Sequence, residues 1–187
     1  MTSDDLASRV IDALNASEIP YMVVGSLSTN VYGVPRATRD ADFVVQASAR
    51  SIAELARELG SPFRLDPQLA FETITGTSRY VLTVADSSFK IELFLLSDDQ
   101  HDQARFGRRV ARDVDGRIFC LPTVEDVIIT KLRWSQRGKR LKDVDDVRNV
   151  IAIQGNALDW SYVESWRDRH GTREFLEQIR ASIPPNL

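Results

Sequence analysis

Three acidic residues stand in strand-like stretches where carboxylates are uncommon. Asp40 and Asp42 open the apolar run 40–45, and Glu92 interrupts the apolar run 89–96. Because side chains alternate between the two faces of a strand, Asp40 and Asp42 point the same way. Neighbouring carboxylates repel each other and Asp is depleted from strands, so a shared divalent cation would explain the pair. The three acids are therefore candidate metal ligands.

A short turn before these acids could hold a phosphate group. Residues 21–24 form an apolar run typical of a buried strand, Gly25 and Ser26 follow it, and residues 27–32 have helical potential. The first N–H groups of a helix are unpaired and carry a partial positive charge. Gly lets a phosphate approach the backbone and Ser adds a hydroxyl donor, so Gly25 and Ser26 are candidate phosphate-binding residues.

Together these features suit metal-assisted transfer of a nucleotide. Divalent ions bridge phosphates, neutralise developing charge and lower the pKa of an attacking hydroxyl. Each feature alone also has an ordinary structural explanation, because a Gly-Ser turn after a strand is common. The acids could equally form ion pairs: Asp40 and Asp42 with Arg36 or Arg39, and Glu92 with Lys90 or Arg79.

The order of these motifs resembles the nucleotidyltransferase superfamily, whose simplest members are the minimal nucleotidyltransferases. It runs from an apolar strand and Gly25-Ser26 through Asp40-x-Asp42 to Ile91-Glu92-Leu93. The stretch Arg36-Ala-Thr-Arg-Asp-Ala-Asp42 is similar to the AbiEii-type branch. Asp126-x4-Lys131, followed by Lys142-Asp143-x-x-Asp146, is similar to the pattern that such toxin-like members carry in their helical half. Glu92 is a departure, because many relatives have Asp as the third acid.

The resemblance implies an enzyme that moves a nucleoside monophosphate from a nucleoside triphosphate to an acceptor hydroxyl. It implies Mg²⁺ or Mn²⁺ as cofactor, with Asp40 and Asp42 as metal ligands and Glu92 as a ligand or base. It also implies the toxin of a toxin–antitoxin or phage-defence system, with tRNA or a protein as acceptor and a cognate antitoxin as partner. A small-molecule adenylyltransferase, such as an antibiotic-modifying enzyme, and a non-catalytic nucleotide-binding or partner-binding module are the alternatives.

Basic residues are the natural partners of a triphosphate, and this chain concentrates them in two places. Lys131 and Lys142, supported mainly by the resemblance, are candidate nucleotide-binding residues. Arg36 and Arg39 come next because they precede the Asp pair, and Thr38 could orient that loop. A solvated helix face whose lysines and arginines pair with Asp143, Asp145 and Asp146 is the structural alternative.

Composition limits the classes of protein to which this chain can belong. A chain of 187 residues fits one domain, or one domain with a helical extension. A net charge of -3 argues against broad nonspecific binding to nucleic acid. No apolar run approaches the roughly 20 residues that cross a bilayer, and the acidic N-terminus does not resemble a signal peptide. We therefore expect a cytoplasmic protein without a membrane partner, with His101 at the surface and Cys120 as a buried structural thiol.

The elements that must position the site follow from periodicity. We expect an α/β (α+β) fold, in which residues 1–121 form a small mixed-sheet nucleotidyltransferase core with flanking helices. Residues 122–187 form a C-terminal helical portion packed on that core in one compact unit. Helices are predicted over residues 6–14, 51–59, 141–153, 160–168 and 174–183 and after Thr123; strands over 71–75, 80–84 and 89–96; a hairpin over 110–121; and a basic link over 135–140.

Overall fold

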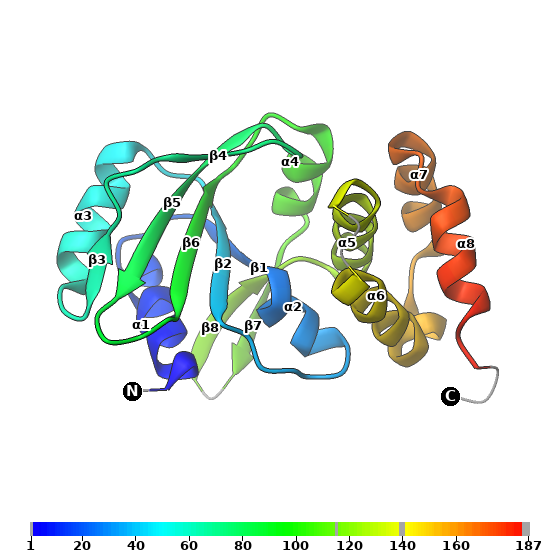
Figure 1. Cartoon of the computed structure of the whole chain (residues 1–187), viewed down its shortest axis with the longest axis horizontal. Coiled ribbons are helices and arrows are strands. Elements are labelled where there is room, and N and C mark those ends of the chain that lie inside the picture. Colours follow the sequence, from blue (N-terminus) through cyan, green and yellow to red (C-terminus); the bar gives the residue numbers. More distant parts are fainter. Residues whose placement is uncertain (1, 115, 139–140, 185–187) are drawn as a thin grey trace. The chain divides into compact units, whose positions relative to one another are not determined.

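The computed structural model describes residues 2–114, 116–138 and 141–184. Its contacts divide the chain into two units (Figure 1). The first unit comprises Met1–Leu27 and Ala37–Pro122, and the second comprises Ser28–Arg36 and Thr123–Leu187. The expected α/β class with a mixed sheet is confirmed. Among the described residues, no helix is both long enough and apolar enough to span a membrane.

A mixed sheet forms the centre of the first unit. Its strand order is β1 (Tyr21–Val24), β2 (Asp40–Val45), β6 (Lys90–Leu95), β5 (Thr77–Val84) and β3 (Phe63–Leu65), and β4 (Ala70–Glu72) also pairs with β5. Strands β2 and β6 run parallel, whereas the other pairs are antiparallel. The strands predicted over 80–84 and 89–96 are confirmed by β5 and β6, whereas β4 covers only the start of the strand predicted over 71–75, and β3 was not predicted.

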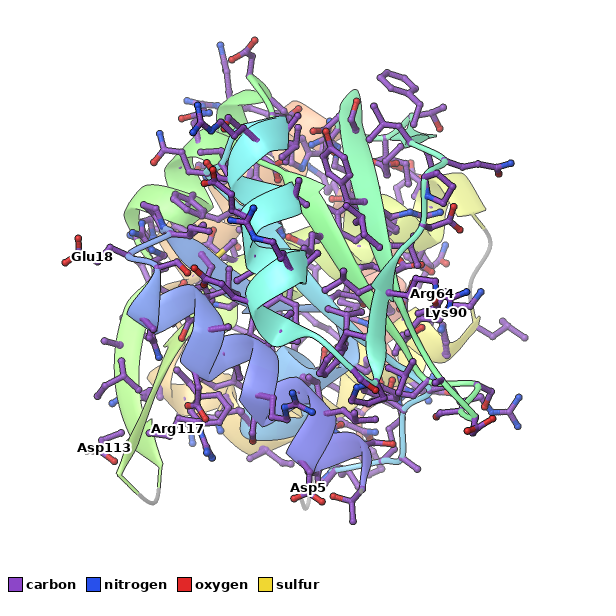
Figure 2. The ribbon with its side chains drawn as sticks, turned by 90° about the vertical axis from the view of Figure 1, so that its left-hand side faces the viewer. Asp5, Glu18, Arg64, Lys90, Asp113 and Arg117 are labelled. Carbon is purple, nitrogen blue, oxygen red and sulfur yellow. The ribbon has the colours of Figure 1, made fainter. Side chains whose placement is uncertain are left out.

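Two helices cover one face of this sheet. Figure 2 shows α1 (Ser3–Ala16) and α3 (Ala49–Leu59) side by side in front of the strands. Their apolar stripes meet Phe43, Leu82 and Leu93, which are fully buried. Burial of a side chain of this size contributes about 1.5–3 kcal/mol. Since Ala41, Phe43 and Val45 point into this core, the alternating residues Asp40 and Asp42 lie on the opposite face.

The helix boundaries in this unit follow from their caps. Helix α1 is capped by Thr2 in a capping box with Asp5 and begins three residues before the predicted start at residue 6. Helix α3 ends before Gly60 as expected, and Gly60 has a φ of 55°.

The rest of the first unit contains one helix and a hairpin. Helix α4 (Gln100–Gly107) carries His101, which is only 2% exposed, so its expected surface position was wrong. The predicted hairpin is confirmed by the antiparallel pair β7 (Val110–Val114) and β8 (Arg117–Leu121). Asp115 of its predicted turn lies outside the described residues. Cys120 is partly buried against the core rather than fully enclosed.

Helices build the second unit. They are α5 (Val124–Gly138), α6 (Leu141–Gln154), the short 3-10 helix η1 (Gly155–Ala157), α7 (Trp160–His170) and α8 (Arg173–Ala181). Most of helix α2 (Gly25–Tyr32) also belongs to this unit. Buried side chains of this unit include Ile128, Val150, Val163 and Leu176. The predicted link 135–140 was wrong over residues 135–138, which continue α5, and residues 139–140 lie outside the description.

Candidate functional site

The predicted acids stand on two neighbouring parallel strands. In the register of β2 and β6, Asp42 is opposite Glu92 and Asp40 is opposite Lys90. Directly opposed residues of neighbouring strands share a face of the sheet. Asp40, Asp42 and Glu92 are all partly exposed. The polar face of β2 and β6 therefore carries all three predicted carboxylates, opposite the face that packs on α1 and α3.

The Gly25 turn lies directly against the Asp42 carboxylate. Gly25 has a φ of 65°, a backbone conformation that L side chains rarely adopt. A methyl group at Gly25 would overlap the Asp42 Oδ2 atom. Ser26, the next residue, is buried at the start of α2. The absence of a side chain at position 25 thus leaves the space that Asp42 occupies.

Thr38 holds the other carboxylate. Its hydroxyl lies 2.7 Å from Asp40 Oδ1 and 3.1 Å from the Asp40 carbonyl oxygen, and it donates to these acceptors. One side chain therefore links the loop before β2 to the first acid of the strand. Thr38 was expected to orient this loop beside a nucleotide; its hydroxyl contacts Asp40, and a role in nucleotide binding stays a prediction.

Glu92 forms an ion pair with a strand neighbour. Arg79 on β5 donates from Nη1 to Glu92 Oε2 at 3.1 Å, and its guanidinium lies 5.6 Å from the centre of the Phe94 ring. The side chains of Arg79 and Glu92 are 33% and 20% exposed. Pairing with Arg79 was one of the structural alternatives for Glu92 in the sequence, and this ion pair is confirmed.

The donor set can be compared with what Mg²⁺ requires. Within the described ranges, no three His, Cys, Asp or Glu side chains are gathered as a ready-made metal site. Mg²⁺, however, is commonly held by one or two carboxylates together with waters and substrate phosphates. Asp40, which accepts a hydrogen bond from Thr38, and Asp42, which lies against Gly25, could supply these two carboxylates.

Arg39 and the predicted cations of the second unit have different environments. Arg39 is exposed on the loop before β2, and Lys142 is exposed on α6. Lys131 on α5 lies 2.8 Å from both Asp143 Oδ1 and Asp146 Oδ2, and its side chain is 11% exposed. Lys131 therefore pairs with α6 carboxylates as the structural alternative proposed, but at a buried rather than a solvated position, and its role in nucleotide binding stays a prediction.

Arg36 joins the same buried network. Its Nε and Nη2 atoms donate to the two carboxylate oxygens of Asp146, each at 3.1 Å. Burial acts to raise the pKa of Asp146, but hydrogen bonds and charges from Arg36 and Lys131 outweigh it and leave the pKa below its ordinary value. Any role of Arg36 or Lys131 in phosphate binding would therefore have to compete with Asp146.

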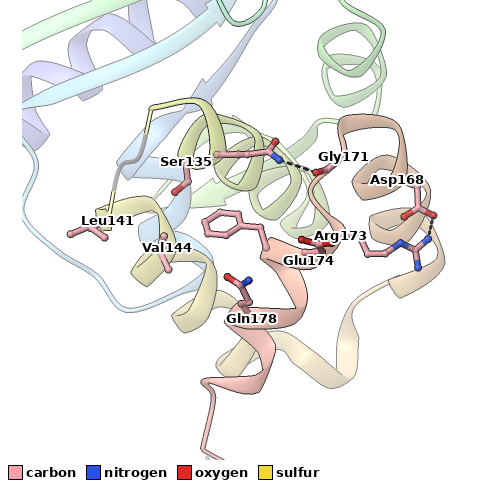
Figure 3. A pocket seen from close by; sticks show the side chains of 10 residues that line it. Ser135, Leu141, Val144, Asp168, Gly171, Arg173, Glu174 and Gln178 are labelled. Carbon is pink, nitrogen blue, oxygen red and sulfur yellow. Dashed lines mark hydrogen bonds and ion pairs between the residues drawn. The ribbon is translucent and has the colours of Figure 1, made fainter.

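The second unit also contains a hollow that sequence analysis did not indicate. Its volume is about 760 Å³, and Figure 3 shows residues of α5, α6 and α8 around it. On its rim, Arg173 contacts Asp168 at 2.7 Å and Gln136 donates to the Gly171 carbonyl oxygen at 2.8 Å. None of the predicted site residues lines this hollow. Its lining comes from four helices, since Asp168 lies on α7, and no motif in the sequence brings these helices together.

The fold can be compared with known proteins. Neither a protein-family model nor a curated protein sequence matches this chain. A solution structure of the antibiotic-resistance factor ANT(2'')-Ia is similar with a TM-score of 0.61 and 14% identity, covering 96% of this chain and 98% of that chain. An antigenic nucleotidyltransferase-like protein from Paracoccidioides brasiliensis is similar with a TM-score of 0.57 and 18% identity, covering 97% and 93%.

A third similar structure is the lincosamide antibiotic adenylyltransferase LnuA, solved with lincomycin bound. Its TM-score is 0.51 at 12% identity, over 77% of this chain and 93% of that chain. Identities this low carry information about architecture rather than about substrates. The described mixed sheet and its flanking helices match these neighbours, so this chain has the nucleotidyltransferase fold.

Proposed function

We infer that this chain is a Mg²⁺-dependent nucleotidyltransferase, which moves a nucleoside monophosphate from a nucleoside triphosphate to an acceptor hydroxyl. The observation that carries this proposal is the position of Asp42. Its carboxylate is seated against the Gly25 turn and stands in register with Glu92, one alternation from Asp40. A sheet face built in this way brings phosphate-binding backbone and metal-binding oxygens together.

Each residue then has a role in the transfer. Asp40 and Asp42 would hold the cation, Thr38 would fix the Asp40 carboxylate, and Gly25 and Ser26 would hold phosphate oxygens at the start of α2. A bound Mg²⁺, or Mn²⁺, supplies charge neutralisation on the phosphates. Arg39, which is exposed beside the pair, is a candidate cation for the triphosphate.

The reaction itself is an in-line displacement. The acceptor oxygen forms a bond to the α-phosphorus while the bond between that phosphorus and the β-phosphate oxygen breaks, so that pyrophosphate leaves. Glu92 would complete the metal site or take the proton of the acceptor hydroxyl. Both roles are compatible with its place opposite Asp42 on the neighbouring strand.

The identity of the acceptor is a finer part of the proposal. The AbiEii-type motifs at Arg36–Asp42 and Asp126–Asp146 support tRNA or a protein as acceptor, in a cytoplasmic toxin–antitoxin or phage-defence system with a cognate antitoxin. A small-molecule acceptor is the second candidate. It is favoured by the match to ANT(2'')-Ia solved with adenylyl-2''-tobramycin, which covers 91% of this chain and 97% of that chain.

The test is a transfer assay with all four α-³²P-labelled nucleoside triphosphates and Mg²⁺. Separate reactions contain total tRNA, a protein lysate, and a panel of aminoglycosides and lincosamides. We expect one nucleotide to label one acceptor class, and Asp40→Ala to abolish labelling while circular dichroism shows an intact fold. Asp98→Ala, which removes an exposed carboxylate of the same unit, is the matched control.

The outcomes separate the alternatives. Labelling of tRNA or protein supports the toxin, and labelling of an antibiotic supports the small-molecule enzyme. Full transfer by the Asp40→Ala variant would disprove the carboxylate assignment. Nucleotide binding without any release of pyrophosphate, in the presence of every acceptor, would identify a non-catalytic binding module of the same fold.

A further inference from the structure

Arg79 adds a cation to the face that carries the three carboxylates. On the antiparallel strands β5 and β6, Arg79 is opposite Phe94, and Val81 is opposite Glu92. Arg79 is therefore a diagonal neighbour of Glu92 on the same face of the sheet. Its ion pair with Glu92 therefore links β5 to β6. Glu92 on β6 is in turn in register with Asp42 on β2.

The hydrogen bonding of Arg79 is incomplete. Its Nε atom is buried and has no hydrogen-bond partner among the described residues. A guanidinium carries five N–H donors, and the hydrogen bond of Arg79 to Glu92 uses one nitrogen, Nη1. An unsatisfied buried donor is costly, and such groups in folded proteins call for an explanation such as a bound ion. After pairing with Glu92, this guanidinium therefore still has N–H donors that can bind another acceptor.

The charges on this face of the sheet indicate which ligand would satisfy the guanidinium of Arg79. Three carboxylates on one sheet face repel one another; Lys90 stands opposite Asp40 on this face, and Arg79 forms an ion pair with Glu92. A complex of a divalent cation with a nucleoside triphosphate brings a positive and a negative group to the face at once. Glu92 would then turn from Arg79 toward the cation, and Arg79 would donate from its planar fork to two oxygens of a phosphate.

We propose that Arg79 is a partner-exchange residue, which holds Glu92 in the nucleotide-free protein and binds a phosphate of the metal–nucleotide complex. Glu92 is then released toward the cation held by Asp40 and Asp42. This inference rests on the proposed nucleotidyl transfer and adds a residue that the sequence motifs did not identify as phosphate-binding.

The test measures two affinities on the full chain. Mn²⁺ alone is titrated by electron paramagnetic resonance, and Mg²⁺ with a non-hydrolysable nucleoside triphosphate analogue is titrated by calorimetry. Arg79→Gln should bind Mn²⁺ alone severalfold more tightly, because Glu92 is freed. The same variant should bind the metal–nucleotide complex about tenfold more weakly, because one charge-assisted hydrogen-bond donor to phosphate is lost. A residue with a merely structural role would not shift the two affinities in opposite directions.

Two further variants connect the effect to Glu92. In Arg79→Gln/Glu92→Gln, the gain in Mn²⁺ affinity should disappear, because that gain depends on the released carboxylate. Arg79→Lys, which keeps the charge without the fork, should retain part of the nucleotide affinity. Arg64→Gln removes an exposed arginine from β3 of the same sheet and should leave both affinities unchanged (Figure 2).

The controls also separate this inference from the proposed function. If the native protein binds neither Mn²⁺ nor the nucleotide complex, or if Asp42→Ala binds both as well as the native protein does, the proposed function itself fails. If Asp42→Ala loses binding while Arg79→Gln changes neither affinity, or lowers both, the partner exchange alone is wrong. A rise in Mn²⁺ affinity that persists without Glu92 would likewise overturn it.

Discussion

The space beside Gly25 decides how close this turn, the candidate phosphate-binding turn, can come to Asp42 on β2. The backbone there has a φ of 65°, and the place of a side chain is taken by Asp42 Oδ2. Two constraints therefore coincide at one residue: a left-handed backbone conformation and a steric contact with a candidate metal ligand. Substitutions can separate the two constraints, because Gly76 has the left-handed backbone conformation without the steric contact.

We predict that Gly25→Ala lowers transfer activity at least about 100-fold, as expected for a misplaced catalytic group. The methyl group would displace the Asp42 carboxylate, in addition to a backbone strain of about 1–3 kcal/mol. Gly76→Ala is the matched control, because Gly76 has a φ of 71° and nothing within 4 Å of its added methyl group. Transfer rates and urea unfolding of both variants test this, and equal losses of activity would show that strain alone is responsible.

Thr38 allows a milder test at the same scale. Thr38→Val keeps the shape of the side chain but removes the hydroxyl that donates to Asp40. We expect the affinity for Mn²⁺ to fall about fivefold, corresponding to roughly 1 kcal/mol for one hydrogen bond. Thr38→Ser should restore most of that affinity, as measured by the same titration. If Val binds Mn²⁺ as tightly as Thr, the orientation of Asp40 does not depend on this contact.

At the scale of elements, the sequence predicted the strands and helices that are marked by side-chain alternation, helical periodicity or a terminal glycine. Strand β2 was predicted over its full length because alternation and two acids mark it, and α3 ends at a glycine that allows positive φ. Strand β3 has three residues, too few for a periodic pattern, and it exists through its pairing with β5. Helix α5 continues through a polar stretch that sequence alone did not distinguish from a link.

The candidate site was predictable to a similar extent. Side-chain alternation placed Asp40 and Asp42 on one face, but the register of β6 beside β2 is a non-local property. For the same reason, the sequence could list Arg79 only as one of two partners for Glu92. The ion pairs of Lys131 join α5 to α6, and no spacing within either helix distinguishes such pairing from phosphate binding.

Lys131 offers a test of these two roles between α5 and α6. Lys131→Met keeps the length of the side chain but leaves Asp143 and Asp146 without their shared ammonium, at 2% and 6% side-chain exposure. Removing one partner of a buried ion pair typically costs about 3–5 kcal/mol, so we expect a destabilisation of that order in urea unfolding. Lys142→Met, at an exposed position of α6, should change stability by less than about 0.5 kcal/mol. Weaker nucleotide binding with unchanged stability would instead favour the phosphate-binding role of Lys131.

At the scale of the whole molecule, the chain leaves the first unit within α2 and returns to it after Arg36. Contacts inside the second unit explain why residues 28–36 group with the helices. Gln154 donates to the Tyr32 carbonyl oxygen at 3.1 Å, and Arg36 donates from Nε and Nη2 to the two carboxylate oxygens of Asp146. These contacts link residues far apart in the sequence, so a boundary drawn from composition at residues 121 and 122 could not include them.

The same network of the second unit makes its stability depend on pH. The pKa of Asp146 in the folded protein lies below its ordinary value of 3.8, because hydrogen bonds from Arg36 and Lys131 outweigh the effect of burial. The contribution of this carboxylate to the free energy of unfolding is therefore fully present above that ordinary value. It is lost as the pH falls through the lower pKa of the folded state, where Asp146 becomes protonated.

We predict that Asp146→Asn makes the protein less stable near neutral pH but flattens its loss of stability on acidification. The variant has no carboxylate at this position to protonate, so its free energy of unfolding should fall less steeply below about pH 4 than that of the native protein. Urea unfolding from about pH 7 to about pH 3 measures both slopes. Asp145→Asn removes a carboxylate whose side chain is 63% exposed and should keep the native slope. Identical slopes in all three proteins would mean that the pKa of Asp146 does not differ between the folded and unfolded states, so that pairing with Arg36 and Lys131 does not lower it.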